Sequence, residues 1–112
     1  MIITGTDIKM TRGDSETIRV TLKKEGVQIP LIDGDIIYFT VKTSTITEEK
    51  TLQKIITEFT DGTALIEITP ADTKNLLFTT YIYDLQLTDA QGNVITLIKP
   101  SKFIISGEVT HE

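Results

Sequence analysis

The sequence predicts an all-β protein in which two sheets pack face to face. Thr, Ile and Val, whose side chains branch at Cβ, account for 43 of the 112 residues. Such side chains lose rotamer freedom in a helix and fit the pleated surface of a sheet. Ala, the strongest helix former, occurs only three times. Apolar and polar residues also alternate along several segments, which is the pattern of a strand with one buried face.

The alternation is clearest in residues 16–23, where three apolar side chains share one face and polar side chains share the other. The same pattern predicts further strands at residues 7–10, 35–43, 53–60, 63–69, 80–89, 94–98 and 102–109. Pro30 and Pro100 are expected at strand edges, where a missing N–H does little harm. The inward residues that we expect in the core are Ile18, Val20, Leu22, Ile37, Phe39, Val41, Ile66, Ile68, Leu85 and Phe103.

Residues 69–76 break the alternation and predict one or two helical turns. Thr69 is a good N-cap residue, Pro70 suits the first helical position, and Asp72 places an acid at the third. We therefore expect one short helical crossover near residues 70–77. Seven or eight strands with such a crossover are typical of an antiparallel β-sandwich. A closed barrel is the alternative, although barrels usually have fewer crossovers and more Gly at their corners.

The composition excludes several classes of protein and partner. The chain has no Cys, so disulfides and thiolate metal sites are impossible. It has no apolar run of about 18 residues, the length that spans a membrane. Its first residues lack the basic and apolar regions of a signal peptide. The net charge of −5 disfavours nucleic acid as a partner. We therefore expect neither a membrane nor a nucleic-acid partner, and no signal peptide.

The segment that follows the crossover is similar to a corner of immunoglobulin-like sandwiches. Leu76 lies at the end of the crossover, and Tyr81 follows five residues later. In a tyrosine corner the ring fills the corner of the core and its hydroxyl bonds a backbone group of the crossover. We expect Tyr81 and Leu76 to form this corner, with Tyr83 as the alternative tyrosine. The whole prediction is a single immunoglobulin-like domain spanning residues 1–112.

Several segments in a fixed order carry a resemblance to a known family. They are residues 13–14 with 18–22 (IRVTL), 37–42 (IYFTVK), 64–73 (ALIEITPADT), 81–87 (YIYDLQL), 89–93 (DAQGN) and 103–110 (FIISGEVT). Each segment alone is typical of any sandwich strand or turn, and their order is the specific part. In this order, which covers nearly the whole chain, the sequence resembles the N-terminal domain of the baseplate upper protein of tailed bacteriophages that infect Gram-positive hosts.

This resemblance implies a non-enzymatic structural module of the virion, made in the cytoplasm of the bacterial host. Its implied partners are other tail and baseplate proteins, such as the tail hub and the receptor-binding protein. A homo-oligomer is also implied, because phage assemblies repeat one subunit around a symmetry axis. Two alternatives remain open, namely a module that binds cell-wall polysaccharide and a module of a bacterial surface adhesin. The absence of Trp counts against the first, and the missing signal peptide against the second.

The sequence contains no pattern that predicts catalysis, a cofactor or a metal ion. The G-x-S-x-G, P-loop and G-x-G-x-x-G motifs are absent. His111 is the only His and lies next to the end of the chain, where an ordered catalytic His is not expected. Residues 33–35 (DGD) and 61–62 (DG) are ordinary turn sequences. Residues 12–14 (RGD) match a cell-adhesion tripeptide, but a tight turn between two strands needs the same residues.

One outward position predicts a protein interface. Tyr38 faces away from the core side of the strand at 35–43, beside apolar Ile36. Exposed aromatic residues often anchor protein interfaces. We therefore expect a contact surface at Tyr38 and Ile36, with the apolar start Ile2-Ile3 as a further candidate.

Overall fold

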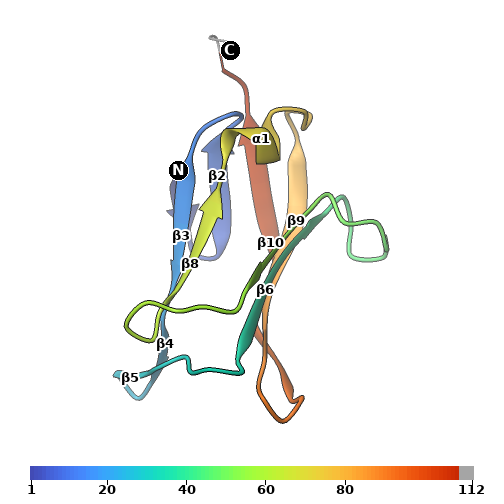
Figure 1. The fold of residues 1–112 in the computed structure, drawn as a ribbon. Helices are drawn as coiled ribbons and strands as arrows, with labels where there is room; N and C mark the ends of the chain where they lie inside the picture. The colour runs from blue at the N-terminus through green and yellow to red at the C-terminus, as the bar shows by residue number, and fades with distance from the viewer. Residues whose placement is uncertain (109–112) are drawn as a thin grey trace.

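The segments with alternating residues form strands over most of residues 1–108, the part of the chain that the computed structural model describes (Figure 1). The strands are β1 (Ile2–Thr4), β2 (Asp7–Thr11), β3 (Glu16–Val20), β4 (Leu22–Lys24), β5 (Val27–Ile29), β6 (Ile36–Lys42), β7 (Leu52–Ile56), β8 (Ala64–Ile68), β9 (Thr80–Thr88) and β10 (Val94–Ser106). The one helix, α1 (Pro70–Thr73), is a single turn and so is shorter than the predicted crossover.

Two sheets of unequal size pack against each other, which confirms the predicted all-β sandwich. The large sheet has the strand order β1-β2-β10-β9-β6-β7, and the small sheet consists of β3 and β8. The small sheet lies over one face of the large sheet (Figure 1). All pairings are antiparallel except that of β2 with β10, which is parallel. The β4–β5 hairpin continues the small sheet at one end.

The core lies between the sheets and centres on three aromatic rings. Phe39, Tyr83 and Phe103 stand with ring centroids 5.4 to 6.3 Å apart in tilted and edge-on arrangements, which are the favoured geometries for aromatic pairs. Eight of the ten predicted core residues are buried. Ile18 on β3 and Leu22 on β4 are only half-buried, because both line an open cleft between the two layers.

The C-terminal strand differs from the prediction in a way that bears on function. Two strands were expected at 94–98 and 102–109, but β10 runs unbroken from Val94 to Ser106. Pro100 lies inside this strand rather than at its end. Its ladder with β9 is irregular there, with register shifts between Thr96 and Ile98 and between Ile98 and Ser101. The missing N–H of Pro100 is tolerated because β10 has a neighbour on only one side at this position.

The β4–β5 hairpin was not predicted, although its turn has a clear local signal. The predicted strand at 16–23 is interrupted at Thr21, and β4 then turns back into β5. Glu25 and Gly26 occupy the two turn positions with φ of 53° and 79°. Positive φ at both central residues is the two-residue turn that matches strand twist, and Gly at the second position adopts it without strain.

The molecule has two dissimilar ends along its strands, and we name them here. The helix end comprises α1, the loop at 74–79, Arg12 and Glu108. The hairpin end comprises the β4–β5 hairpin, the loop at 30–35 and the β9–β10 turn (Figure 1). At the helix end, Thr69 N donates to the Asp72 carboxylate at 2.7 Å, and the buried Thr73 hydroxyl accepts from the Gly13 amide at 2.8 Å. The first bond caps α1, and the second fixes α1 to the turn between β2 and β3.

Candidate protein-contact surface

Tyr81 lies where a tyrosine corner requires it, at the helix end of the core. Its ring is 5% exposed. The Leu77 amide donates to the Tyr81 hydroxyl at 3.0 Å, and the Leu77 carbonyl lies within 3.4 Å of the same oxygen. The hydroxyl thus meets the residue after Leu76, whose half-buried side chain packs against the core. Tyr83, the alternative, instead donates its hydroxyl to the carbonyl of Thr6, and burial, together with Asp7, raises the pKa of Tyr83.

Arg12 is bound inside the protein, which bears directly on the tripeptide at 12–14. Its guanidinium makes a bidentate pair with Glu108 at 3.1 to 3.2 Å and donates to the Leu76 carbonyl at 3.2 Å. It also stacks 4.0 Å from the centre of the Phe78 ring. Gly13 has a φ of 85° in a tight turn. The tripeptide therefore serves as the predicted turn, and its arginine holds the helix end together.

The predicted interface residues lie on the outer face of the large sheet, where further apolar side chains lie on other strands. Tyr38 is directly opposite Ile55 on β7. Ile36 is opposite Thr88 on β9, which in turn is opposite Val94 on β10. Tyr38 and Ile36 are half-buried rather than exposed. Their neighbours Ile55 and Val94 are 53% and 61% exposed.

We call Ile36, Tyr38, Ile55 and Val94 the outer strip. The sequence prediction missed Ile55 and Val94 as contact residues. A signal for Ile55 was present, because Ile55 and Ile56 are adjacent, and in a strand one of two adjacent residues must face outward. Val94 becomes part of the strip only through strand pairing across β9, which single-sequence periodicity does not reveal. The strip runs across four strands toward the hairpin end.

A polar groove of about 260 Å³ lies beside the outer strip on the same face. Thr40, Lys42, Asp84 and Gln86 from β6 and β9 line it together with loop residues between β6 and β7. Burial raises the pKa of the Asp84 carboxyl, and the nearby Lys42 opposes this shift only in part. The groove therefore offers a hydroxyl, an amide, a carboxylate and an ammonium for hydrogen bonding to a polar ligand.

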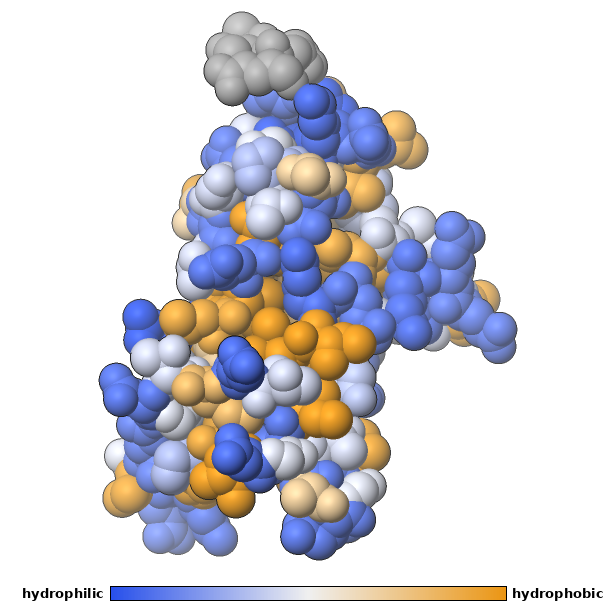
Figure 2. Space-filling model, viewed as in Figure 1, coloured by the Kyte–Doolittle hydropathy of each residue, from blue (hydrophilic) through white to orange (hydrophobic). Residues whose placement is uncertain are grey.

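The hairpin end carries further exposed apolar side chains that the sequence prediction did not single out. Figure 2 shows apolar surface gathered in the middle and lower half of the molecule, toward the hairpin end, while the upper half is mainly hydrophilic. The exposed apolar residues of the hairpin end are Val27, Ile29, Ile32, Val94 and Ile95. An apolar concentration of this kind at one end of a domain marks a contact region. The predicted Ile2-Ile3 candidate is also exposed, on the edge strand β1.

The remaining sequence candidates are turn residues or lie outside the described part of the chain. The Asp35 carboxylate accepts from the Ile32 amide at 3.0 Å, as in an ordinary turn. Asp61 has a φ of 51° and begins the turn before β8. Within residues 1–108, no three His, Asp or Glu side chains are grouped to hold a metal ion, and no helix is long and apolar enough to cross a membrane. His111 lies outside the described residues.

Comparison with protein-family models, curated proteins and solved structures found no match to this chain.

Proposed function

We propose that this chain is a non-enzymatic structural module of a bacteriophage tail or baseplate, and that it mediates protein–protein assembly of the host-adsorption apparatus. The phage context comes from the ordered sequence resemblance to the baseplate upper protein family. The outer strip is the observation that carries the assembly role. Its partners in this proposal are other tail proteins, such as the tail hub and the receptor-binding protein, or a second copy of the chain.

The outer strip has the composition of an interface centre. Tyr38 supplies an aromatic ring with a polar tip, and Ile36 and Ile55 place aliphatic surface beside it. Val94 extends the strip on β10, separated from Ile36 by Thr88. Aromatic side chains within an apolar patch often carry most of the energy of a protein interface. The strip stands on paired strands, so its side chains are held in place before a partner arrives, and less entropy is lost on binding.

Sedimentation velocity with separately purified tail proteins of the same phage tests this function. We expect the chain to form a defined complex with the tail hub or the receptor-binding protein at micromolar concentration. Ile55→Asp should weaken that complex at least about tenfold, because it buries a charge at the centre of the contact. Ile46→Asp is the matched control, since Ile46 is 91% exposed in the β6–β7 loop. A chain that ignores every tail protein of its phage would contradict the proposal.

The polar groove favours a second function, binding of host cell-wall polysaccharide. Sugars are recognised by amide, hydroxyl and carboxylate groups beside an aromatic ring, and here Gln86 lies directly opposite Tyr38 on the neighbouring strand. Isothermal titration with purified wall polysaccharide separates the two functions. Polysaccharide binding that is lost in Asp84→Ala and retained in Ile55→Asp would favour the polysaccharide-binding function. The assembly function predicts that the unmodified chain and both variants give no heat of binding with the polysaccharide.

A further inference from the structure

The cleft between the two sheets is a feature that the proposed function does not use. It has a volume of about 430 Å³ and opens beside the Gly5-Thr6 turn that joins β1 to β2. Ile18 of β3 and Leu22 of β4 face Leu97 and Ile98 of β10 across it, and the core residues Phe39 and Leu85 lie at its base. The apolar walls are only half-buried.

The cleft exists because the small sheet is too narrow to cover the large one. At about 4.8 Å between strands, the six strands of the large sheet are about 24 Å across, while the two strands of the small sheet are about 5 Å across. On one side, β7 and β8 approach each other and close the sandwich. On the other side, the β1–β2 hairpin reaches only as far as its Gly5-Thr6 turn. Beyond that turn, no strand of residues 1–108 lies between the two sheets.

Two strand edges border this space without a hydrogen-bonded neighbour among the described residues. β3 pairs only with β8. β10 pairs with β2 only from Phe103 onward, so residues 94–102 are paired on the β9 side alone. That segment is about 30 Å long at 3.3 Å per residue. Unpaired edges are templates for an added strand. The β10 edge is interrupted by Pro100 and by two register shifts, and its Lys102 amide already donates to Asp7. The regular edge of β3 is therefore the better template.

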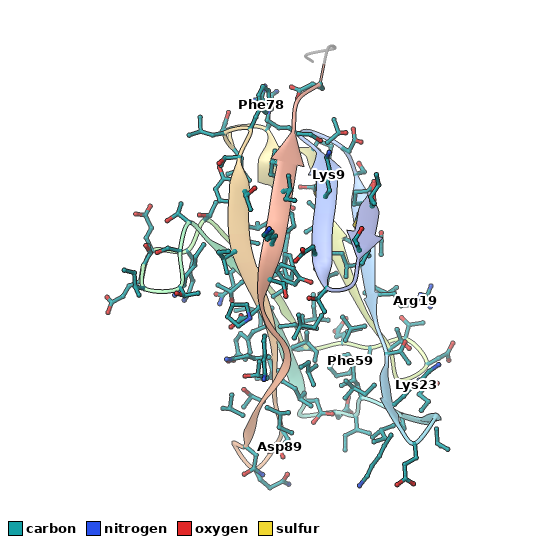
Figure 3. All side chains as sticks on the ribbon, turned by 180° about the vertical axis from the view of Figure 1, so that it is seen from behind. Lys9, Arg19, Lys23, Phe59, Phe78 and Asp89 are labelled. Carbon is teal, nitrogen blue, oxygen red and sulfur yellow. The ribbon has the colours of Figure 1, made fainter. Side chains whose placement is uncertain are left out.

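The rim of the cleft is basic in a protein whose net charge is −5. Arg19 of β3 and Lys23 of β4 line the cleft, and Figure 3 shows both at the outer edge of that side of the molecule. Neither forms an ion pair with any residue in the described range. Two unpaired cations beside an apolar slot complement a ligand that is apolar in the middle and acidic at its flanks.

We propose that the cleft accepts an extended segment of another protein as an additional β-strand, with alternate apolar side chains inserted between the sheets and acidic residues beside Arg19 and Lys23. The backbone of the segment pairs with the edge of β3 or of β10, and its apolar side chains complete the core. This site is separate from the outer strip and does not depend on the proposed function.

A synthetic peptide of about nine residues, matched to the length of the unpaired edge, tests the proposal. It alternates Ile and Thr, carries two Asp at each end and bears a fluorescent label; binding to the intact chain is followed by fluorescence anisotropy. We expect saturable binding. A peptide with the same core and Lys ends should bind at least about tenfold more weakly, because each exposed charge pair contributes a factor of about three to five. Binding of the two peptides with equal affinity would overturn the proposal, as would no binding of the acidic peptide.

Charge reversal of the rim locates the site. Arg19→Glu with Lys23→Glu should weaken the acidic peptide about tenfold and improve the Lys-ended peptide. The control, Lys50→Glu with Lys74→Glu, makes the same change of charge at exposed positions away from the cleft and should leave both affinities unchanged. An equal loss in both double variants would show that only net charge matters and would overturn the assignment. If the rim variant fails to fold, the salt dependence of the two peptides in the unmodified protein gives the same answer, because only the acidic peptide should weaken with salt.

Backbone methylation of the peptide tests strand pairing itself. Methylation of alternate amides removes the ladder hydrogen bonds of one edge and should abolish binding, while methylation of the other set should have a small effect. Equal binding by the unmethylated peptide and both methylated forms would show that no strand is added. Dissociation of a self-associated form of the chain by the acidic peptide would instead identify a second copy as the occupant and contradict the proposal.

Discussion

The two ends of this sandwich differ in how their side chains are used. At the helix end, charged and backbone groups bond to each other, as in the contacts of Arg12 with Glu108, Leu76 and Phe78. At the hairpin end the side chains of β5 are all exposed, and Val94 and Ile95 at the start of β10 face water. The helix end also exposes Leu77 and Phe78, but its bonds tie distant parts of the chain together, whereas the hairpin end exposes more apolar side chains.

The bonds that stabilise the fold and the surface proposed for protein contact therefore lie in different parts of the molecule. The helix end joins Arg12, near the start of the chain, to Glu108, 96 residues later, and such long-range pairs restrict the whole fold. The outer strip and the cleft lie toward the other end, where substitutions disturb fewer buried bonds. The predictions that follow compare matched substitutions across the molecule, beginning with the largest expected effect.

The largest difference is expected between two isoleucines of β10. Ile105 is 2% exposed, and Ile105→Ala should lower the free energy of unfolding by about 2–5 kcal/mol through lost burial and a new cavity. Ile98 forms a wall of the cleft and is half-buried, so Ile98→Ala should cost only about 1 kcal/mol. Urea denaturation of both variants measures the difference. Equal costs would show that the cleft wall is packed as tightly as the core.

Arg12 should matter more to stability than any cation on the cleft rim. Arg12→Ala removes the pair with Glu108, the bond to the Leu76 carbonyl and the stacking on Phe78, and should cost about 1–3 kcal/mol. Lys23→Ala should change stability by no more than about 0.5 kcal/mol. Thermal unfolding of the two variants at equal ionic strength is the measurement. A tolerated Arg12→Ala would mean that the helix end is held by packing alone.

The two tyrosine hydroxyls provide a smaller comparison. Tyr81→Phe leaves the Leu77 amide without its acceptor and should cost about 0.5–1.5 kcal/mol. Tyr38 is half-buried on the outer strip, and Tyr38→Phe should leave stability within about 0.5 kcal/mol. Urea midpoints of the two variants decide this. No loss for Tyr81→Phe would argue against a stabilising tyrosine corner.

The smallest effects concern two carboxylates whose pKa values shift in opposite directions. Burial raises the pKa of Asp72, but hydrogen bonds from Lys54 and Thr69 outweigh it and hold the pKa below its usual value. Asp72 therefore stabilises the fold above its unfolded pKa, and this stability is lost as the pH falls through the folded pKa. Asp72→Asn should cost about 1 kcal/mol at pH 7 and almost nothing in acid.

Asp84 should behave in the opposite way. Because burial raises its pKa, ionising Asp84 at neutral pH costs stability, and that cost disappears below the unfolded pKa. Asp84→Asn should therefore stabilise the protein slightly at pH 7 and have no effect in acid. Urea denaturation at pH 7 and at low pH, run on both Asn variants, tests the two signs together. The same sign for both variants at pH 7 would show that the two environments do not differ as described.

The alternation of apolar and polar residues predicted much of the fold, because the side on which a strand is buried can be read from neighbouring residues. The alternation placed β6, β8 and β9 and most of the core, and the residues around Pro70 placed the helical turn. It did not reveal the parallel pairing of β2 with β10, which joins residues 95 positions apart, such as Ile8 and Phe103. The pattern also predicted two strands where β10 is one. Pro100 is tolerated inside β10 because its N–H side has no strand partner, and the sequence alone does not show which side of a strand is paired.

The candidate sites were less predictable than the fold, because they depend on what lies across the sheet. Tyr38 and Ile36 were found from their outward positions, but Val94 joins them only through two strand pairings. The cleft could not be predicted at all. It results from the unequal widths of the two sheets, and neither width is encoded in any single segment.

We propose that the hairpin end, with the outer strip, is where this protein meets other proteins. Amide hydrogen exchange of the chain, alone and in complex with whichever tail protein binds it in sedimentation, tests this proposal. We expect added protection in β5, the start of β6 and the β9–β10 turn, with little change around α1 and Arg12. Protection confined to the helix end, or a stable complex that leaves the hairpin end and the outer strip unchanged, would contradict the account.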